Sequence, residues 1–171
     1  MDVLRAHLRQ IYNTYRTALL NRKYYGCKLA CYQKYNFWLD VAIAIGATGS
    51  SGVAGLAIWG TITGKFTWLV ISGVATVLSV IKPILQLGKH IEKYTKLYTG
   101  HTSIYLELKA MVEDIEISRA VPRKWVDRYS SIRLLIREFA GLDDPKPDDT
   151  LIRTLQTRIN EEINPADLWV P

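Results

Sequence analysis

The stretch that decides the fold is VAIAIGATGSSGVAGLAIWGTITG, residues 41–64, which holds no charged residue in 24 positions. After Lys65, a second charge-free run continues for 16 positions, over residues 66–81. A helix that spans a bilayer needs about 20 mostly apolar residues. The first run is long enough by itself. The second is long enough only if Lys82 extends its ammonium group to the lipid headgroups, which lengthens the span to about Leu87. The two runs therefore predict a membrane hairpin.

Charged residues are distributed unevenly along the chain. Residues 1–100 carry 12 Lys and Arg against three acidic residues, or +9, whereas residues 101–171 carry 10 against 13, or −3. The basic residues flank the two apolar runs, and the hinge between the runs offers Lys65 alone. The positive-inside rule therefore predicts that both termini lie in the cytoplasm. Membrane lipid is the expected partner of these flanks. Nucleic acid is not expected, because no stripe of basic and aromatic residues lies outside them.

Helical segments flank the hairpin on both sides, and the sequence shows no β-pattern. We expect residues 1–36 to form an N-terminal amphipathic cytosolic helix, residues 37–88 the two-helix transmembrane hairpin, and residues 89–171 a cytosolic helical bundle. The helix of the second span is expected to continue into this last segment. Residues 1–36 contain no apolar signal-peptide core, so the first span should remain in the membrane. The sequence thus predicts an all-α protein.

Apolar residues recur in steps of three and four in both cytosolic segments, which indicates helices that pack along a seam. Val121-Pro122 should end a helix, and Asp148 or Asp149 should cap the last one. His101 lies within a seam, where it is either a packed core residue, the commoner role, or a pH switch. The seam positions are Leu4, Leu8, Ile11, Tyr15 and Ala18; Leu97, His101, Ile104, Leu108, Met111 and Ile115; Trp125, Tyr129, Ile132, Ile136 and Phe139; and Leu151, Leu155, Ile159 and Ile163.

Aromatic residues gather just before the first span. Such enrichment is typical of the membrane interface, where the rings lie at the level of the headgroups. We therefore expect this group at the inner face of the membrane. It consists of Tyr24, Tyr25, Tyr32, Tyr35, Phe37 and Trp38.

The first span is rich in small residues, with glycines at every third position and a second line of small residues at every fourth. Small residues let helix backbones approach closely, which matters in lipid because hydrophobicity does not drive helices together there. We expect this surface to assemble a homo-oligomer, since it wraps more of the helix than one neighbour covers. Packing against the second span of the same chain is the other interpretation. The assembly face consists of Ala42, Gly46, Gly49, Ser50, Gly52, Ala54 and Gly55.

Polar residues of the hairpin give two further candidate sites. Ser72, Thr76 and Ser79 place a line of hydroxyl groups on the second span. Such a line can face the pore of an oligomer, or bond back to carbonyls of its own helix. Asp40 and Lys82 are the charges nearest to the spans, and a tight hairpin brings them within one turn of each other. An ion pair at the inner interface and two separately hydrated charges are both open.

No motif for catalysis or for a cofactor is present. Cys27 and Cys31 lie one helical turn apart, a spacing that suits a disulfide poorly, and no His lies nearby to complete a metal site. The segment GTITGK, residues 60–65, fails as a phosphate loop because its glycines are too close together and no Ser or Thr follows the Lys. We therefore expect a protein that is not an enzyme and that needs no metal or cofactor.

The order of a long amphipathic helix, a two-span hairpin and a cytosolic helical tail resembles the SLATT family. These are two-transmembrane effector domains associated with bacterial nucleotide-signalling and conflict systems. The resemblance covers the whole chain at the level of architecture and rests on no catalytic motif. It implies a multi-pass protein of the bacterial inner membrane that acts in antiviral defence by abortive infection. Because the chain shows no fused sensor domain, it also implies a trigger from a separate sensor protein or a nucleotide messenger system.

Two functions from different classes follow. In the first, the chain is an oligomerising, pore-forming or membrane-depolarising effector that its cytosolic helices hold silent. In the second, it is a non-conducting anchor or scaffold that tethers a partner through those helices. The small residues of the first span favour the effector, because a passive anchor gains nothing from weakly apolar positions.

Overall fold

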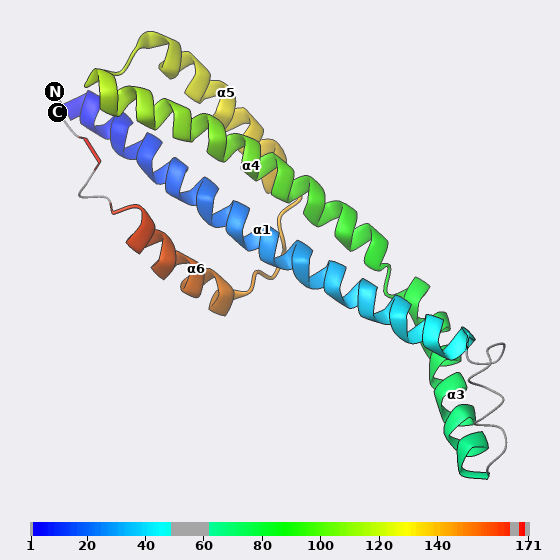
Figure 1. The fold of residues 1–171 in the computed structure, drawn as a ribbon. Helices are drawn as coiled ribbons and strands as arrows, with labels where there is room; N and C mark the ends of the chain where they lie inside the picture. Colours follow the sequence, from blue (N-terminus) through cyan, green and yellow to red (C-terminus); the bar gives the residue numbers. More distant parts are fainter. Residues whose placement is uncertain (1, 49–61, 165–167, 170–171) are drawn as a thin grey trace. The chain divides into compact units, whose positions relative to one another are not determined.

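The computed structural model describes residues 2–48, 62–164 and 168–169, and these residues are helical over most of their length (Figure 1). The prediction of an all-α fold is confirmed, since no strand occurs within these ranges. The helices are α1 (Asp2–Thr48), α3 (Ile62–Ile84), α4 (Leu87–Ser118), α5 (Arg123–Ala140) and α6 (Asp149–Glu162).

The chain divides into two compact units. The bundle unit consists of Met1–Leu29 and Lys93–Pro171, and the hairpin unit consists of Ala30–Glu92. Both α1 and α4 contribute residues to each unit. The N-terminal part of α1 therefore belongs to the same compact unit as the C-terminal helices.

The bundle unit packs α1 and α4 against each other in antiparallel directions. Tyr15 stacks on Tyr105 with ring centroids 5.3 Å apart, and further along α1 Tyr25 lies 6.2 Å from the ring of Tyr94. In Figure 1, α5 lies alongside α4, and α6 lies alongside α1. Ion pairs Arg128–Glu107 and Lys124–Asp114 join α5 to α4. The ion pair Lys23–Glu162 and a hydrogen bond donated by Arg16 to Asn160 join α1 to α6.

The predicted seams form the core of the bundle unit. All six seam positions of α4 are buried, as are four of the five in α1. Leu4 is the exception and is 39% exposed, because it lies near the end of the unit. The prediction for α5 and α6 is confirmed at Tyr129, Ile132, Leu155 and Ile159, which are buried, while the other seam positions of these helices are half-buried.

Helix ends in the bundle unit follow the predicted signals. α5 begins directly after Pro122 and has Gly141 as its C-cap residue. Asp148 is the N-cap of α6, and its carboxylate accepts a hydrogen bond from the backbone N–H of Leu151 at 3.1 Å. This bond satisfies one of the free N–H groups at the start of the helix.

The second apolar helix does not continue into α4. α3 ends at Ile84, and α4 begins at Leu87 after a two-residue turn. Pro83 removes a backbone donor from the last turn of α3, and Gln86 adopts the left-handed conformation with φ of 47°. The expectation of an unbroken helix is therefore wrong at this point.

Candidate functional site

The hairpin unit pairs the end of α1 with α3 and the start of α4 in antiparallel directions. Three contacts fix this register: Tyr32 stacks on His90, Asp40 pairs with Lys82, and Gly46 lies against Ala75. Of the two arrangements open for Asp40 and Lys82, the structure contains the ion pair. Both side chains remain partly accessible, and Asp40 also accepts a hydrogen bond from Asn36 at 3.1 Å.

Gly46 is used for packing within the chain. It is buried, and a Cβ atom at this position would overlap the Cβ of Ala75 on α3. Ala42, one turn earlier on α1, is half-buried. The remaining residues of the predicted assembly face lie outside the described residues: Gly49, Ser50, Gly52, Ala54 and Gly55.

The predicted hydroxyl line lies beside this contact. Ser72, Thr76 and Ser79 line a hollow of about 150 Å³ together with Gly46. The Thr76 hydroxyl donates to the carbonyl of Ser72 at 2.8 Å, and the Ser79 hydroxyl donates to the carbonyl of Thr76 at 2.7 Å. The structure therefore brings residues of both predicted groups to one surface, where two of the hydroxyl protons are used within α3.

The rest of α3 presents apolar side chains to its surroundings. α3 is long and apolar enough to cross a membrane, the one such helix in the described part of the chain, and only 6% of its most apolar stretch is buried. Core helices of water-soluble proteins are mostly buried, whereas a contiguous exposed apolar surface marks contact with lipid or a partner. Large exposed side chains are Ile62, Phe66, Leu69, Val70, Val74, Val77, Val80 and Ile84.

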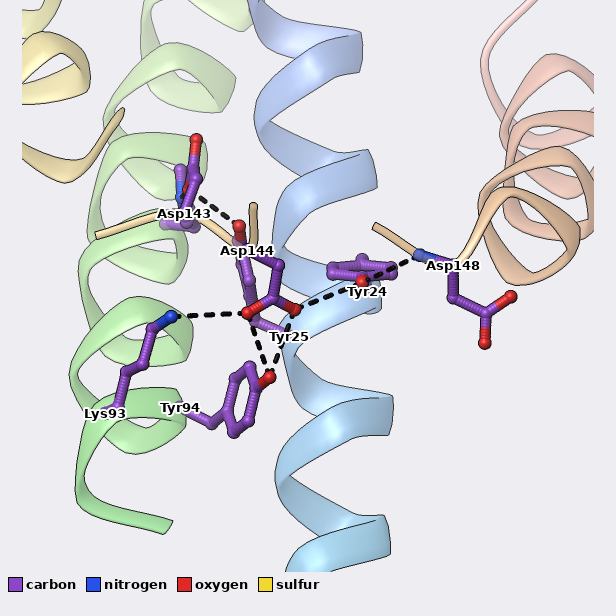
Figure 2. Close-up of polar contacts among 8 residues, drawn as sticks. Tyr24, Tyr25, Lys93, Tyr94, Asp143, Asp144 and Asp148 are labelled. Atoms are coloured by element: carbon purple, nitrogen blue, oxygen red, sulfur yellow. Dashed lines mark hydrogen bonds and ion pairs between the residues drawn. The ribbon is translucent and has the colours of Figure 1, made fainter. Parts of the chain in front are cut away.

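A network of tyrosines and aspartates holds the α5–α6 loop against α1 and α4 in the bundle unit (Figure 2). We call this network the loop clasp; it consists of Tyr24, Tyr25, Lys93, Tyr94, Asp143, Asp144 and Asp148. Figure 2 shows Asp144 at its centre, where it accepts hydrogen bonds from Tyr94 at 2.9 Å, Tyr24 at 3.2 Å and Lys93 at 3.3 Å. Hydrogen bonds to a carboxylate are stronger than those between neutral groups, so the loop is firmly attached.

The tyrosines of the loop clasp are buried as well as hydrogen-bonded. Tyr25 donates to Asp143 at 2.6 Å, and burial together with this carboxylate raises the pKa of its hydroxyl. Burial also raises the pKa of Tyr24. Both residues are about 4% exposed, so the expectation that they lie among lipid headgroups is wrong. Tyr35, Phe37 and Trp38, by contrast, are more than half exposed.

His101 occupies the seam next to the loop clasp and is 3% exposed. Its ring stacks on Tyr25 at 5.3 Å and lies 5.7 Å from Phe139. Burial lowers its pKa, an effect that the carboxylate of Asp143 partly opposes. Nε2 has no hydrogen-bond partner and lies 4.0 Å from Asp143 Oδ1. The packed role is the one that this geometry supports at neutral pH.

In the part of the chain that the structure describes, no three His, Cys, Asp or Glu side chains come close enough together to bind a metal ion. Cys27 and Cys31 are both exposed and free.

Comparison of the chain with protein-family models, with curated proteins and with solved structures finds no match. The function is therefore inferred from the geometry of the two units.

Proposed function

We propose that this protein is an oligomerising effector of the bacterial inner membrane that forms a pore or otherwise depolarises the membrane. The exposed apolar surface of α3 is the main support for this proposal, because exposing so much apolar surface to water is unfavourable. In this arrangement the hairpin unit spans the membrane twice. The bundle unit, which covers its own apolar seams, lies in the cytoplasm with both termini.

The Asp40–Lys82 ion pair supports the inserted state. Charges near the edge of the hydrocarbon region are costly, and an opposite charge within contact distance lowers the cost of both. The positions beyond this pair toward the hinge, on α1 from Val41 and on α3 back to Phe66, carry no charge.

The hollow beside Gly46 supports assembly through the hairpin unit. Small residues and hydroxyl groups meet on one surface there, which allows close approach of a neighbouring helix and hydrogen bonding to it. Gly73 adds a second notch on α3, since a Cβ at that position would meet nothing within 4 Å. In the proposed conducting assembly, hairpins pack in a ring through such notches.

In this proposal the bundle unit regulates the activity of the hairpin unit. The loop clasp and the core seams give α1 and α4 a cytosolic connection that a trigger can rearrange, and both helices also belong to the hairpin unit. The resemblance to SLATT effectors suggests a separate sensor protein or a nucleotide messenger as the trigger, in a system of antiviral defence.

The alternative is a non-conducting anchor that tethers a partner through the bundle unit. The hydroxyl protons of Thr76 and Ser79 favour it, because they are bonded to carbonyls of α3 and not offered to water. The oxygen atoms of these hydroxyl groups can still accept hydrogen bonds, so the two functions require a direct test.

Membrane potential distinguishes them. Cells express the full chain with and without its neighbouring genes, under the stimulus that activates the system, and carry a potential-sensitive dye. Depolarisation and growth arrest are expected for the wild-type chain. The triple variant Ser72→Ala, Thr76→Val, Ser79→Ala should reduce both effects, whereas Thr67→Val, which removes a similarly bonded hydroxyl from the same helix, should not. A stable potential, with the partner still recruited to the membrane, establishes the anchor instead.

A further inference from the structure

A groove of about 680 Å³ lies in the bundle unit between α1 and α5. Its volume is in the range of about 300–1,000 Å³ that is typical of small-molecule sites. Ala18 of α1, Ile104 of α4 and Ile136 of α5 give it an apolar part. This groove takes no part in the loop clasp or in the hairpin unit.

Three guanidinium groups line the groove without an acidic partner. Arg9 comes from α1, and Arg133 and Arg137 come from one face of α5, one turn apart; the lining contains no Asp or Glu. None of the three has an ion pair with a described residue, although Arg128 on the same helix α5 pairs with Glu107. Like charges one turn apart on a helix destabilise it, so a bound anion would relieve this repulsion.

Neutral polar groups of the lining can complete the coordination of an anion. The side-chain amides of Gln10, Asn13 and Asn21 line the α1 side. His101 also lines the groove, although its Nε2 atom lies 4.0 Å from Asp143 and is therefore not counted among the anion ligands.

We infer that this groove binds a small phosphorylated molecule, with Arg9, Arg133 and Arg137 on the phosphate and the apolar lining on the rest of the ligand. Three guanidinium groups exceed the charge of a single carboxylate and match a phosphate dianion or a pyrophosphate. Arginine recognises such oxygen atoms through paired, charge-assisted hydrogen bonds. This inference does not depend on whether the hairpin unit spans a membrane.

A small ligand fits better than a polyanion such as nucleic acid. Residues 101–171, which supply Arg133 and Arg137, carry −3 as a whole, although α1 on the other side of the groove is basic. A long polyanion that extended beyond the groove over this acidic segment would meet repulsion. The phosphate can belong to a soluble metabolite or to a lipid headgroup, which share this chemistry.

Calorimetric titration of the full chain in detergent micelles tests the inference. The soluble probes are inorganic phosphate, pyrophosphate and phenyl phosphate, and the lipid probe is phosphatidic acid mixed into the micelles. Phenyl phosphate should bind more tightly than inorganic phosphate, because its ring reaches the apolar lining. The double variant Arg133→Gln, Arg137→Gln should weaken binding about a hundredfold, since each charge-assisted hydrogen bond contributes about a factor of ten.

Two controls make the result specific. Arg153→Gln, Arg158→Gln removes the same charge from exposed positions of α6 outside the groove, and should bind as the wild type does. Arg9→Gln, on the opposite helix, repeats the test in case the double variant fails to fold. Binding of the soluble probes, or of phosphatidic acid alone, supports the site and identifies the source of the phosphate. No binding of any probe, or equal loss in the α6 control, overturns it.

Discussion

The two units of this chain place the same residue types in opposite environments. In the bundle unit, Leu108 is fully buried and its helix turns charged side chains outward, whereas in the hairpin unit Leu69 is 71% exposed. Water drives apolar side chains of the bundle unit into a common core. A lipid surrounding exerts no such force, so the hairpin unit can leave its large side chains outside and place its small ones between the helices. The comparison shows that α3 exposes the kind of apolar side chain that α4 buries.

The largest expected effect tests the core of the bundle unit. Leu108→Ala should lower the free energy of unfolding of this unit by about 2–5 kcal/mol, because it removes fully buried atoms and leaves a cavity. Leu69→Ala on α3 should leave it unchanged. Urea unfolding of the full chain in micelles, followed by amide hydrogen exchange of α4, measures both. Similar destabilisation by the two variants would contradict the division into an inward-facing and an outward-facing unit.

The next prediction concerns the pairing of α1 with α3. Gly46→Leu should separate these helices, since Gly46 touches Ala75, whereas Gly73→Leu should not, because the space around Gly73 is open. A short bismaleimide reagent that joins Asp40→Cys to Lys82→Cys, in a chain without Cys27 and Cys31, reports the pairing. We expect a several-fold lower yield for Gly46→Leu alone.

Both variants also bear on assembly. If Gly73→Leu reduces crosslinked oligomers while the hairpin stays paired, the outward notch on α3 contacts other chains. Equal crosslinking within the chain for Gly46→Leu and the wild type would show that the close contact with Ala75 is not required for the hairpin.

The seams could be predicted from the sequence because they depend on local periodicity. Steps of three and four positions identified the buried positions of α4, including Leu97 and Ile115, without knowledge of any partner helix. The N-cap at Asp148 was predictable for the same reason, since capping acts within four residues.

Outside the hairpin, features that join distant segments could not be predicted. The loop clasp links Asp144 to Tyr94 across 50 positions, and no local pattern marks either residue as a partner of the other. Tyr24 and Tyr25 therefore looked like membrane-interface aromatics. The groove similarly needs Arg9 beside Arg133 and Arg137, an arrangement that only the packing of α1 on α5 creates. The three arginines were visible in the sequence, but their proximity was not.

A moderate, pH-dependent effect is expected from the buried histidine of the bundle unit. Burial lowers the pKa of His101 below its ordinary value of 6.5, so the unfolded chain binds this proton more readily than the folded one. The free energy of unfolding should therefore be unaffected by His101 above about pH 7 and should decrease as the pH falls below about 6.5. The decrease ends once the pH is below the lower pKa of the folded state.

His101→Gln should remove this slope, and His7→Gln, at an exposed position, should keep it. Unfolding of the bundle unit in urea between about pH 7 and about pH 5 measures the slope. An unchanged slope in His101→Gln would assign the pH dependence to another group.

The smallest expected effect is a change in stability on substituting glycine at a left-handed backbone position, which occurs once among the described residues of each unit. Arg119 follows α4 with φ of 49°, and Gln86 precedes α4 with φ of 47°. Residues with a Cβ are strained in this left-handed region and glycine is not, although glycine loses more entropy on folding. The left-handed strain of about 1–2 kcal/mol exceeds the entropy cost of glycine, about 0.5–1 kcal/mol, so Arg119→Gly should stabilise the bundle unit by up to about 1 kcal/mol. Gln86→Gly changes the same conformation in the hairpin unit, so it should leave unfolding of the bundle unit unaltered. Thermal unfolding of the two variants, followed through hydrogen exchange of α5, measures the difference. A gain in both would mean that the turn after α3 contributes to the stability of the bundle unit, and that the two units unfold together.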